Sequence, residues 1–364
     1  MLISAKFNGF EEFNMLSKDE TKQFKRLIRL KNYKLRLSNF GVLLGGHGSG
    51  KSKFLKRFIK LKSVLENDTR GYSFCNLETS QITCYLNGIM YSFYIELNNF
   101  GIKKEVLKKI TTSGREIVLF ERNIFLNGSQ IEVQSPDLLR FKNTFLDLCK
   151  KAGSFRSIFP LIAGLDTEYV PIKHIKDIYN WLTNRFEVIT HKDLDYPFEN
   201  YLEYFVIREP RVSKNDIILN TFYTAINFSQ LEKTLIIDDF GESLEFLAVK
   251  YLFQYFLNNV NLMKTQIILS THHTDLLNCN FIRNDEFWFV EKNKNSDKTK
   301  LTNLATFSKA DIKLIKKLKA SIISDNLSTR QSEFLSKFTS LYDKDFLNNY
   351  KLIQKHIEKN REIS

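Results

Sequence analysis

The sequence has few cysteines and no paired cysteine motif. Cys75, Cys84, Cys149 and Cys279 are scattered through 364 residues without a CxxC pair. This spacing disfavours a zinc ribbon or a redox dithiol and indicates a reducing compartment. The apolar fraction of 43% and the charged fraction of 26% are ordinary for a globular protein. The composition therefore excludes the collagen-like, low-complexity and disulfide-scaffold classes.

Long apolar runs are also lacking. No run approaches the ~18 residues of a membrane-spanning helix. The first residues, MLISAKF, lack the basic, apolar and small-residue zones of a signal peptide. We therefore expect a cytoplasmic protein with no membrane partner.

The net charge of +13 is concentrated at the two ends of the chain. Residues 1–62 carry 15 Lys and Arg against 4 Asp and Glu, and residues 306–364 carry 12 against 7. The residues between them carry a net charge of −3. Such an asymmetry suits a nucleic-acid face. Biased codon usage explains it equally well, because charge alone does not identify a partner.

The strongest motif is a complete GxxxxGK[ST] match, formed by Gly45, Gly46, His47, Gly48, Ser49, Gly50, Lys51 and Ser52. Val42–Leu44 before it reads as a strand, and Lys51–Leu61 reads as a helix whose apolar face carries Phe54, Leu55, Phe58 and Ile59. The glycines allow backbone N–H groups to surround a phosphate at the helix N-terminus. The motif predicts that Lys51 reaches the β- and γ-phosphates of a nucleotide and that Ser52 binds Mg²⁺. His47 is expected to be an exposed loop residue.

Other segments outline the fold. Leu2–Phe7 reads as a strand, and the stretch from Ile82 to Val133 is β-rich, with hairpin signals at Asn87-Gly88 and Asn127-Gly128. Residues 137–205 have a mostly helical pattern, and so has the lysine-rich tail from Ser308. A second βαβ-like stretch is expected from TLIIDD, a helix over about Ser243–Leu257, and QIILSTHH.

The ends of these last two strands carry polar side chains. Leu235–Asp239 is an apolar strand that ends in two carboxylates, so Asp238 is predicted to contact the metal. A plain strand end followed by a turn is the alternative. His272 follows the next strand, where it can donate a hydrogen bond to a γ-phosphate, or can be an ordinary loop histidine. The sequence contains no NKxD guanine-reading motif, which argues against a GTPase.

A P-loop, a distant Asp238 and then a THxxxLL motif together resemble the ABC-type ATPases of the SMC/RecF class. The opening MLISAKFNGFEEF resembles the first strand of this group. Three further segments resemble the bacterial members that pair with toxins or nucleases in phage-exclusion operons: NGIMYSFYIELNN to GREIVLFERN, IKDIYNWL, and RNDEFWFVEK at residues 283–292. The resemblance covers about residues 1–305.

This resemblance implies a site shared by two protomers, in which each ATP is held by the P-loop of one chain and a Ser-x-Gly signature of the other. Ser213 fits the signature position, with Asn215 in place of the usual glycine. Asp239 takes the place of the family's catalytic Glu, so hydrolysis is expected to be slow. Gln81 is a candidate for the family's Q-loop glutamine.

The predicted architecture is therefore an α/β P-loop ABC-type ATPase sheet flanked by helices, with an antiparallel β subdomain and a helical insertion. The expected domains are an N-terminal ATPase lobe at 1–135, the helical insertion at 136–207, a C-terminal lobe at 208–305 and a basic helical tail at 306–364.

The resemblance implies an ATP hydrolase that uses ATP and Mg²⁺, with Lys51, Asp239 and His272 as catalytic residues. Its dimerisation, or assembly into a higher homo-oligomer, would control a separately encoded nuclease or toxin in antiphage defence. Two alternatives stay open: a DNA-repair ATPase that clamps duplex DNA, and an ATP switch that scarcely hydrolyses. An ABC transporter subunit is disfavoured by the β-rich and helical insertions.

Overall fold

The computed structural model describes residues 1–17, 27–46, 48–66, 77–125, 128–189, 233–240, 250, 265–292, 298–308 and 311–312, and the statements below concern these residues. Their strands form three sheets. The largest is antiparallel, the second is mostly parallel, and the third is a small antiparallel sheet. The predicted α/β class with a separate antiparallel β region is thereby confirmed.

The mostly parallel sheet contains the strands on which the motifs were expected. Its order is β12 (Phe186–Ile189), β13 (Thr234–Ile237), β14 (Gln266–Thr271), β6 (Phe40–Leu44), β15 (Phe287–Lys292) and β16 (Thr299–Asn303). Neighbours from β12 to β15 run parallel, whereas β16 is antiparallel to β15. Every residue of β6, β13 and β14 is buried. Their continuous apolar sequences are typical of parallel strands that are covered on both faces.

The antiparallel sheet has the order β11 (Gly128–Glu132), β10 (Glu116–Phe125), β9 (Gly101–Ile110), β8 (Ile89–Asn98), β7 (Glu78–Leu86), β1 (Leu2–Phe7) and β2 (Phe13–Asn14). The predicted turn between β7 and β8 is confirmed, since Asn87 and Gly88 have φ of 51° and 83°. Positive φ at both central residues is typical of the type I′ turn. β10 and β11 pair as the second hairpin signal predicts, but Asn127 lies outside the described residues.

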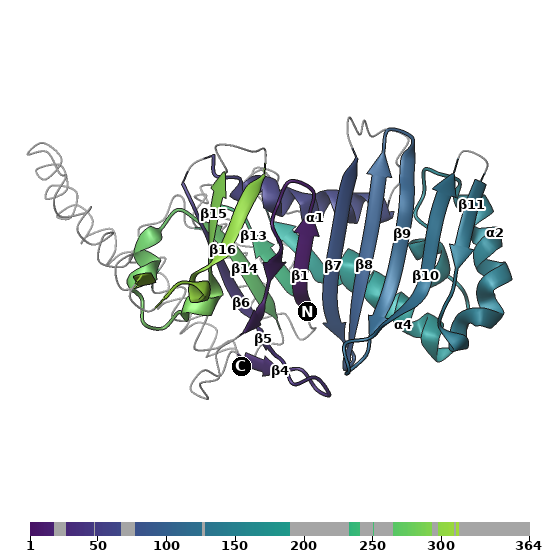
Figure 1. Cartoon of the computed structure of the whole chain (residues 1–364), viewed down its shortest axis with the longest axis horizontal. Coiled ribbons are helices and arrows are strands. Elements are labelled where there is room, and N and C mark those ends of the chain that lie inside the picture. The colour runs from purple at the N-terminus through teal and green to yellow at the C-terminus, as the bar shows by residue number, and fades with distance from the viewer. Residues whose placement is uncertain are drawn as a thin grey trace, which may run out of the picture.

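Helix α1 (Lys51–Glu66) lies between the two large sheets (Figure 1). The Phe58 ring lies 4.8 Å from the Phe7 ring of β1 and 5.1 Å from the Phe186 ring of β12, as measured between centroids. The apolar face of α1 consists of Phe54, Leu55, Phe58, Leu61, Val64 and Leu65. The expectation that Ile59 belongs to this face was wrong, because its side chain is 38% exposed. The helix thus joins both sheets through one core and places its N-terminus at the end of β6.

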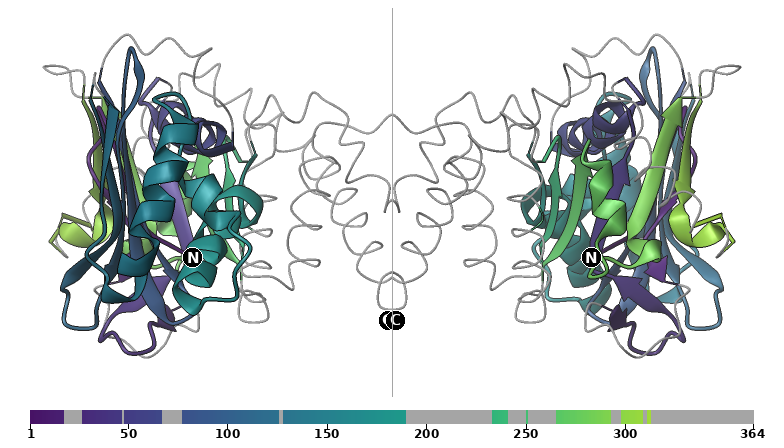
Figure 2. Two further views of the ribbon diagram at one scale, coloured as in Figure 1. Left: turned by 90° about the vertical axis from the view of Figure 1, so that its right-hand side faces the viewer. Right: turned by 90° about the vertical axis from the view of Figure 1, so that its left-hand side faces the viewer.

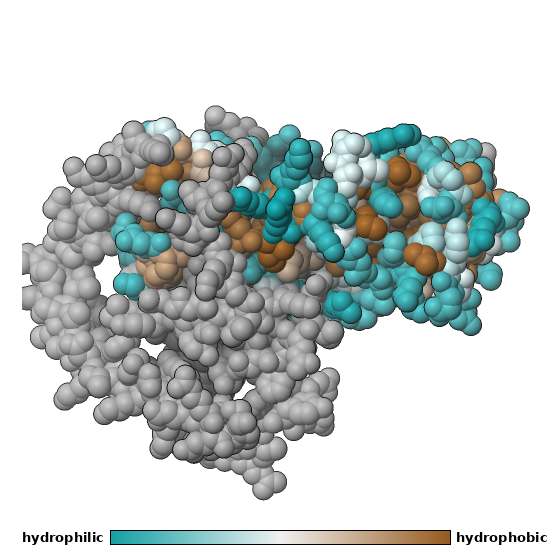
Figure 3. Space-filling view, turned by 90° about the horizontal axis from the view of Figure 1, so that it is seen from below, coloured by the Kyte–Doolittle hydropathy of each residue, from teal (hydrophilic) through white to brown (hydrophobic). Residues whose placement is uncertain are grey.

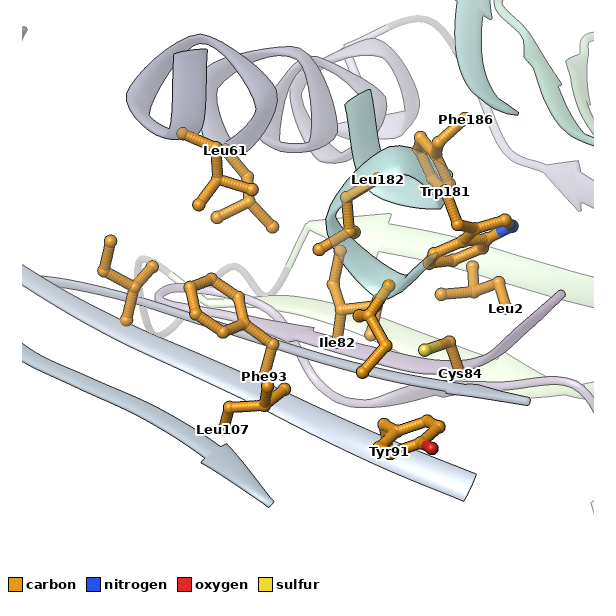
Figure 4. Packing of buried hydrophobic residues seen from close by; sticks show 14 of the residues in the cluster. Leu2, Leu61, Ile82, Cys84, Tyr91, Phe93, Leu107, Trp181, Leu182 and Phe186 are labelled. Carbon is orange, nitrogen blue, oxygen red and sulfur yellow. The ribbon is translucent and has the colours of Figure 1, made fainter. Parts of the chain in front are cut away.

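A helical region covers one face of the antiparallel sheet (Figure 2). It consists of η2 (Pro136–Phe141), α2 (Lys142–Ala152), α3 (Phe159–Ala163), α4 (Val170–Asn180) and the π-helical turn η3 (Trp181–Arg185). Figure 4 shows Trp181 and Leu182 of η3 directed into the core between α1 and the sheet. The mostly helical prediction for residues 137–205 is right for α2, α3 and α4 and wrong at β12, whose β-branched and aromatic residues suit a strand. Residues 190–205 of this prediction lie outside the described residues.

The third sheet is small and has the order β3 (Leu16–Ser17), β5 (Arg36–Ser38) and β4 (Leu27–Arg29). The hairpin of β4 and β5 exposes Arg29, Lys31 and Lys34. The remaining 3₁₀ turns are η5 (Thr274–Asn278), η6 (Asn284–Glu286) and η7 (Leu304–Thr306).

Hydrophilic and hydrophobic residues alternate over the described surface that is seen from below (Figure 3). Among the large apolar side chains, the most exposed are Phe100 at 73%, Phe125 at 57% and Val170 at 57%. Apolar atoms make up much of the surface of any folded protein, so singly exposed side chains of this kind are ordinary.

Some sequence predictions fall outside the described residues. Of the helix predicted over about Ser243–Leu257 only Lys250 is described, and the structure describes the tail after Ser308 only at residues 311–312. The boundaries of the four expected domains stay predictions. None of the described helices is long and apolar enough to cross a membrane.

Candidate functional site

The glycine-rich loop joins the end of β6 to the start of α1, as the motif predicts. Lys51 and Ser52 are the first two residues of the helix. The first N–H groups of an α-helix lack partners within the helix, and the helix dipole is positive at this end. The loop therefore offers the backbone donors that an anion needs. His47 lies outside the described residues.

Three glycines of the loop are required by its conformation or packing. A Cβ atom on Gly45 would lie 2.5 Å from the Val290 carbonyl oxygen, which leaves no room for a side chain. Gly48 and Gly50 have φ of 73° and 106°, in the region that favours glycine. A Cβ atom on Gly46 would meet nothing within 4 Å. Gly45, Gly48 and Gly50 thus set the path of the loop.

The Lys51 ammonium group lies against the loop that precedes it. Its Nζ donates hydrogen bonds to the carbonyl oxygens of Gly45 and Gly46, at 2.7 Å and 3.2 Å. The two ring nitrogens of His272 lie 3.3 Å and 3.4 Å from the same Nζ. Lys51 is 4% exposed. A fixed, largely buried cation therefore lies at the glycine-rich loop, and it comes from the sequence position that the motif predicts.

Ser52 and Asp238 meet at the carboxyl ends of the parallel strands. The Ser52 hydroxyl donates to Asp238 Oδ1 at 3.1 Å. Asp238 follows β13 directly, and β14 separates β13 from β6, which leads into the loop. The structure thus brings the two predicted metal ligands together. A hydroxyl and a carboxylate are hard oxygen donors of the kind that Mg²⁺ prefers.

Asp239 and His272 also lie together. His272 Nε2 is 3.4 Å from Asp239 Oδ1, with about a quarter of each side chain exposed. His272 therefore contacts both Asp239 and Lys51, so all three predicted catalytic residues form one cluster. Asp239 has φ of 51°, which is uncommon for a residue other than glycine, although Asp tolerates it better than most.

Ser270 at the end of β14 was missed in the sequence. Its hydroxyl donates to Asp238 Oδ1 at 2.6 Å and accepts from the Asp239 N–H at 2.8 Å. The only signal was its position, two residues before His272 at the end of an apolar strand.

Gln266 at the start of β14 was missed as well. Its side chain accepts from the Leu2 N–H at 2.7 Å and donates to the Leu2 carbonyl oxygen at 2.8 Å. It also donates to the Ser38 carbonyl oxygen at 3.1 Å. This fully buried amide fastens β1 of the antiparallel sheet to the mostly parallel sheet. The signal was a glutamine in a strand that is otherwise largely apolar.

The start of the RNDEFWFVEK block forms a buried ionic network, whereas Val290 near its end packs its carbonyl oxygen against Gly45 of the loop. Arg283 contacts Asp285 at 2.8 Å and Glu286 at 3.0 Å, and donates to the Ser38 hydroxyl at 3.1 Å. The Ser17 hydroxyl donates to Asp285. The network thus holds the small sheet against the segment that leads into β15.

Other predicted site residues are not gathered here. Ser213 and Asn215 lie outside the described residues, so the signature position stays a prediction. Gln81 lies on β7, where its amide donates to the Ser92 hydroxyl at 3.0 Å, and no described contact joins it to the phosphate loop. Its assignment as the Q-loop glutamine also stays a prediction.

The residues fit a Mg²⁺–nucleotide complex. Ser52 and Asp238 would supply oxygen ligands, and Lys51 would supply a cation for phosphate. The buried Ser49 hydroxyl of the same loop has no hydrogen-bond partner among the described residues. A buried hydroxyl without a partner is uncommon in proteins, and a bound phosphate oxygen would satisfy it.

No protein-family model matches the chain, and no curated protein matches its sequence. Among solved structures, the SMC head domain from Thermotoga maritima is similar, with 13% sequence identity and a TM-score of 0.32. The match covers 76% of this chain and 96% of that domain.

Proposed function

We propose that the chain is an ABC-type P-loop ATPase that binds ATP with Mg²⁺ and hydrolyses it slowly. The observation that carries this proposal is the 3.1 Å hydrogen bond between Ser52 and Asp238, because Ser52 directly follows the largely buried Lys51 at the start of α1. Phosphoryl transfer depends mainly on positioning and on electrostatic stabilisation. A cation, two metal ligands and a helix N-terminus at one strand end meet those needs.

Each side chain has a distinct role in this proposal. Lys51 stabilises the negative charge on the β- and γ-phosphates. To do so, its ammonium group replaces its hydrogen bonds to the Gly45 and Gly46 carbonyl oxygens with hydrogen bonds to phosphate oxygens. Ser52 and Asp238 hold Mg²⁺, which when bound neutralises phosphate charge. Asp239 orients the attacking water and accepts its proton, and His272 donates a hydrogen bond to the γ-phosphate.

The assembly follows from the family resemblance. ATP joins two protomers, with Ser213 and Asn215 of one chain completing the site of the other, and the homodimer or a higher homo-oligomer controls a separately encoded nuclease or toxin. An antiphage role fits this arrangement. The genes that flank this one test it: a neighbouring nuclease or toxin supports effector control, and neighbouring replication genes support DNA repair.

ATP binding and turnover of the wild-type chain and of Lys51→Ala test the core of the proposal. Lys51→Ala removes the fixed cation, so the affinity for ATP and the turnover should both fall. Lys56→Ala is the matched control, because it removes an exposed lysine from the same helix. Unchanged affinity and turnover in Lys51→Ala would contradict the assignment of the phosphate loop.

Duplex DNA binding is a second candidate function, favoured by Arg29, Lys31 and Lys34, which are all exposed on the β4–β5 hairpin. They belong to the N-terminal segment that carries most of the positive charge. Contacts of this kind predict binding that weakens steeply with salt and shows little sequence preference.

Charge reversal of these three residues to Glu should weaken DNA binding at low salt with ATP present. Charge reversal of the exposed Lys142, Lys150 and Lys151 on α2 changes the net charge equally and is the control. Absence of duplex binding by the wild-type chain under these conditions would remove the repair function and leave effector control.

A further inference from the structure

We infer that Ser270 is a positioning residue that holds the metal-binding carboxylate and the proposed general base in one turn; this inference rests on the proposed function. Ser270 is fully buried near the carboxyl end of β14. Strand β14 pairs with β13 on one side and with β6 on the other. Ser270 therefore lies between the two strands whose ends lead to the other site residues.

The Ser270 hydroxyl has a defined direction. The Asp239 N–H can only donate, so it must donate to a lone pair of Ser270 Oγ, at 2.8 Å. The one proton of the Ser270 hydroxyl then lies toward Asp238 Oδ1, at 2.6 Å. Ser52 donates to the same oxygen at 3.1 Å. Two hydroxyls from different elements therefore fix the rotamer of the Asp238 carboxylate.

Ser270 also holds the backbone of the turn that follows β13. Its carbonyl oxygen accepts the Phe240 N–H at 2.7 Å, next to the bond from the Asp239 N–H to its hydroxyl. The positive φ of Asp239 lies between these two anchored N–H groups. The Phe240 side chain is 1% exposed, which fixes the far side of the turn. Such a conformation persists only where its surroundings hold it.

The Ser270 side chain therefore acts through Asp238 and Asp239. Hydrogen-bonded partners of metal ligands set the orientation of the ligand, and their loss lowers metal affinity by roughly 10–100-fold. A serine with a purely structural role would change the stability of the strand without changing how strongly Mg²⁺ promotes nucleotide binding.

The test is the magnesium coupling of nucleotide binding, defined as the dissociation constant with EDTA divided by that with excess Mg²⁺. It is measured by calorimetry with a non-hydrolysable ATP analogue and the full-length chain. Ser270→Ala should reduce this ratio by about tenfold and leave the affinity in EDTA near the wild-type value. Ser270→Thr keeps the hydroxyl and should restore most of the ratio.

Ser157→Ala is the matched control. Ser157 is also buried, and its hydroxyl accepts a backbone N–H, from Phe159 at 3.1 Å, within the helical region. Its loss should lower thermal stability without changing the magnesium coupling. Thermal unfolding of every variant confirms that it is folded, and Ser270→Cys, which has only a weak donor, replaces Ser270→Ala if the latter does not fold.

The outcomes separate this inference from the proposed function. A wild-type chain that binds no nucleotide in either condition contradicts the proposed function and this inference together. If the wild-type chain shows magnesium coupling and Ser270→Ala shows the same ratio, the role of Ser270 is overturned and the proposed function is not. Loss of coupling in Ser270→Ala, with recovery in Ser270→Thr, supports it.

Discussion

Ser52 Oγ lies 3.1 Å from Asp238 Oδ1, although the two residues are 186 positions apart in the sequence. The sheet explains this proximity. Strands β6 and β13 both run parallel to β14 and pair with its opposite sides, so the carboxyl ends of all three strands lie at the same edge of the sheet. Residues that follow such ends converge even when long insertions separate them, and ligands of open α/β sheets commonly bind there.

Asp239→Asn should retain ATP binding and lose hydrolysis by at least ~100-fold, because a general base contributes roughly that much. Asparagine tolerates the positive φ of Asp239 as well as aspartate does, so the backbone should be preserved. Rapid-quench assays of ATP hydrolysis and size-exclusion chromatography with ATP should show a trapped, ATP-bound dimer.

Asp239→Glu should raise turnover if the longer side chain restores the reach of the family's glutamate, although glutamate tolerates a positive φ less well than aspartate. Hydrolysis by Asp239→Asn at the wild-type rate would show that the base lies elsewhere. Glu242, which lies outside the described residues, would then be the first residue to substitute.

The ion pairs between Glu78 of β7 and two basic residues of α1 should stabilise the fold in a pH-dependent manner. Burial alone would raise the pKa of the Glu78 carboxyl, but Lys60 and Arg57 of α1 hold this pKa below its ordinary value of 4.5. The contacts are 2.7 Å and 3.1 Å long. The unfolded chain then binds more protons at acid pH, so this contribution is present above pH 4.5 and is lost as pH falls through the lower, folded-state pKa.

Glu78→Gln should therefore lower the free energy of unfolding at pH 7 by about 0.5–1 kcal/mol, the range of partly exposed ion pairs. The difference from wild type should disappear once pH falls below the folded-state pKa. Chemical denaturation at a series of pH values measures it. Asp147→Asn, which breaks a highly exposed pair with Lys150, is the control and should show little difference at any pH.

The shared site predicts complementation between two inactive variants. Lys51→Ala and Ser213→Arg should each inactivate both sites of their own homodimer. A mixed dimer regains one intact site, and random exchange makes about half of the dimers mixed, so roughly a quarter of wild-type turnover should return. Fluorescence energy transfer between labelled subunits shows that exchange has occurred, and an ATP turnover assay after exchange measures the recovery. If exchange occurs and no activity returns, Ser213 does not act across the dimer.

Local patterns were sufficient for much of the fold. Leu2–Phe7 forms the predicted strand, and Asn87-Gly88 forms the predicted hairpin turn, because each signal depends on neighbouring residues. The strand Phe186–Ile189 was missed, since it directly continues a helical pattern and its partner β13 lies far along the chain. Pairing with a distant strand determined its conformation.

The same distinction applies to the site. The motifs and the family resemblance predicted five site residues, and the structure brings them together: Lys51, Ser52, Asp238, Asp239 and His272. Ser270 and Gln266 could not be predicted, because neither belongs to a motif and each acts only through the tertiary hydrogen bonds that the sheet brings about. The residues next to a buried serine or glutamine in a strand do not indicate which group its side chain will bind.

The most direct test of the central claim is a double-mutant cycle on Ser52 and Asp238. Ser52→Ala, Asp238→Asn and the double variant are compared with the wild type in the Mg²⁺ dependence of ATP turnover. If both residues hold one magnesium ion, each single change should remove most of the turnover, and the double change should remove little more, as expected for residues that act as a unit. Turnover that depends on Mg²⁺ as in the wild type, or losses that simply add, would contradict the shared metal site.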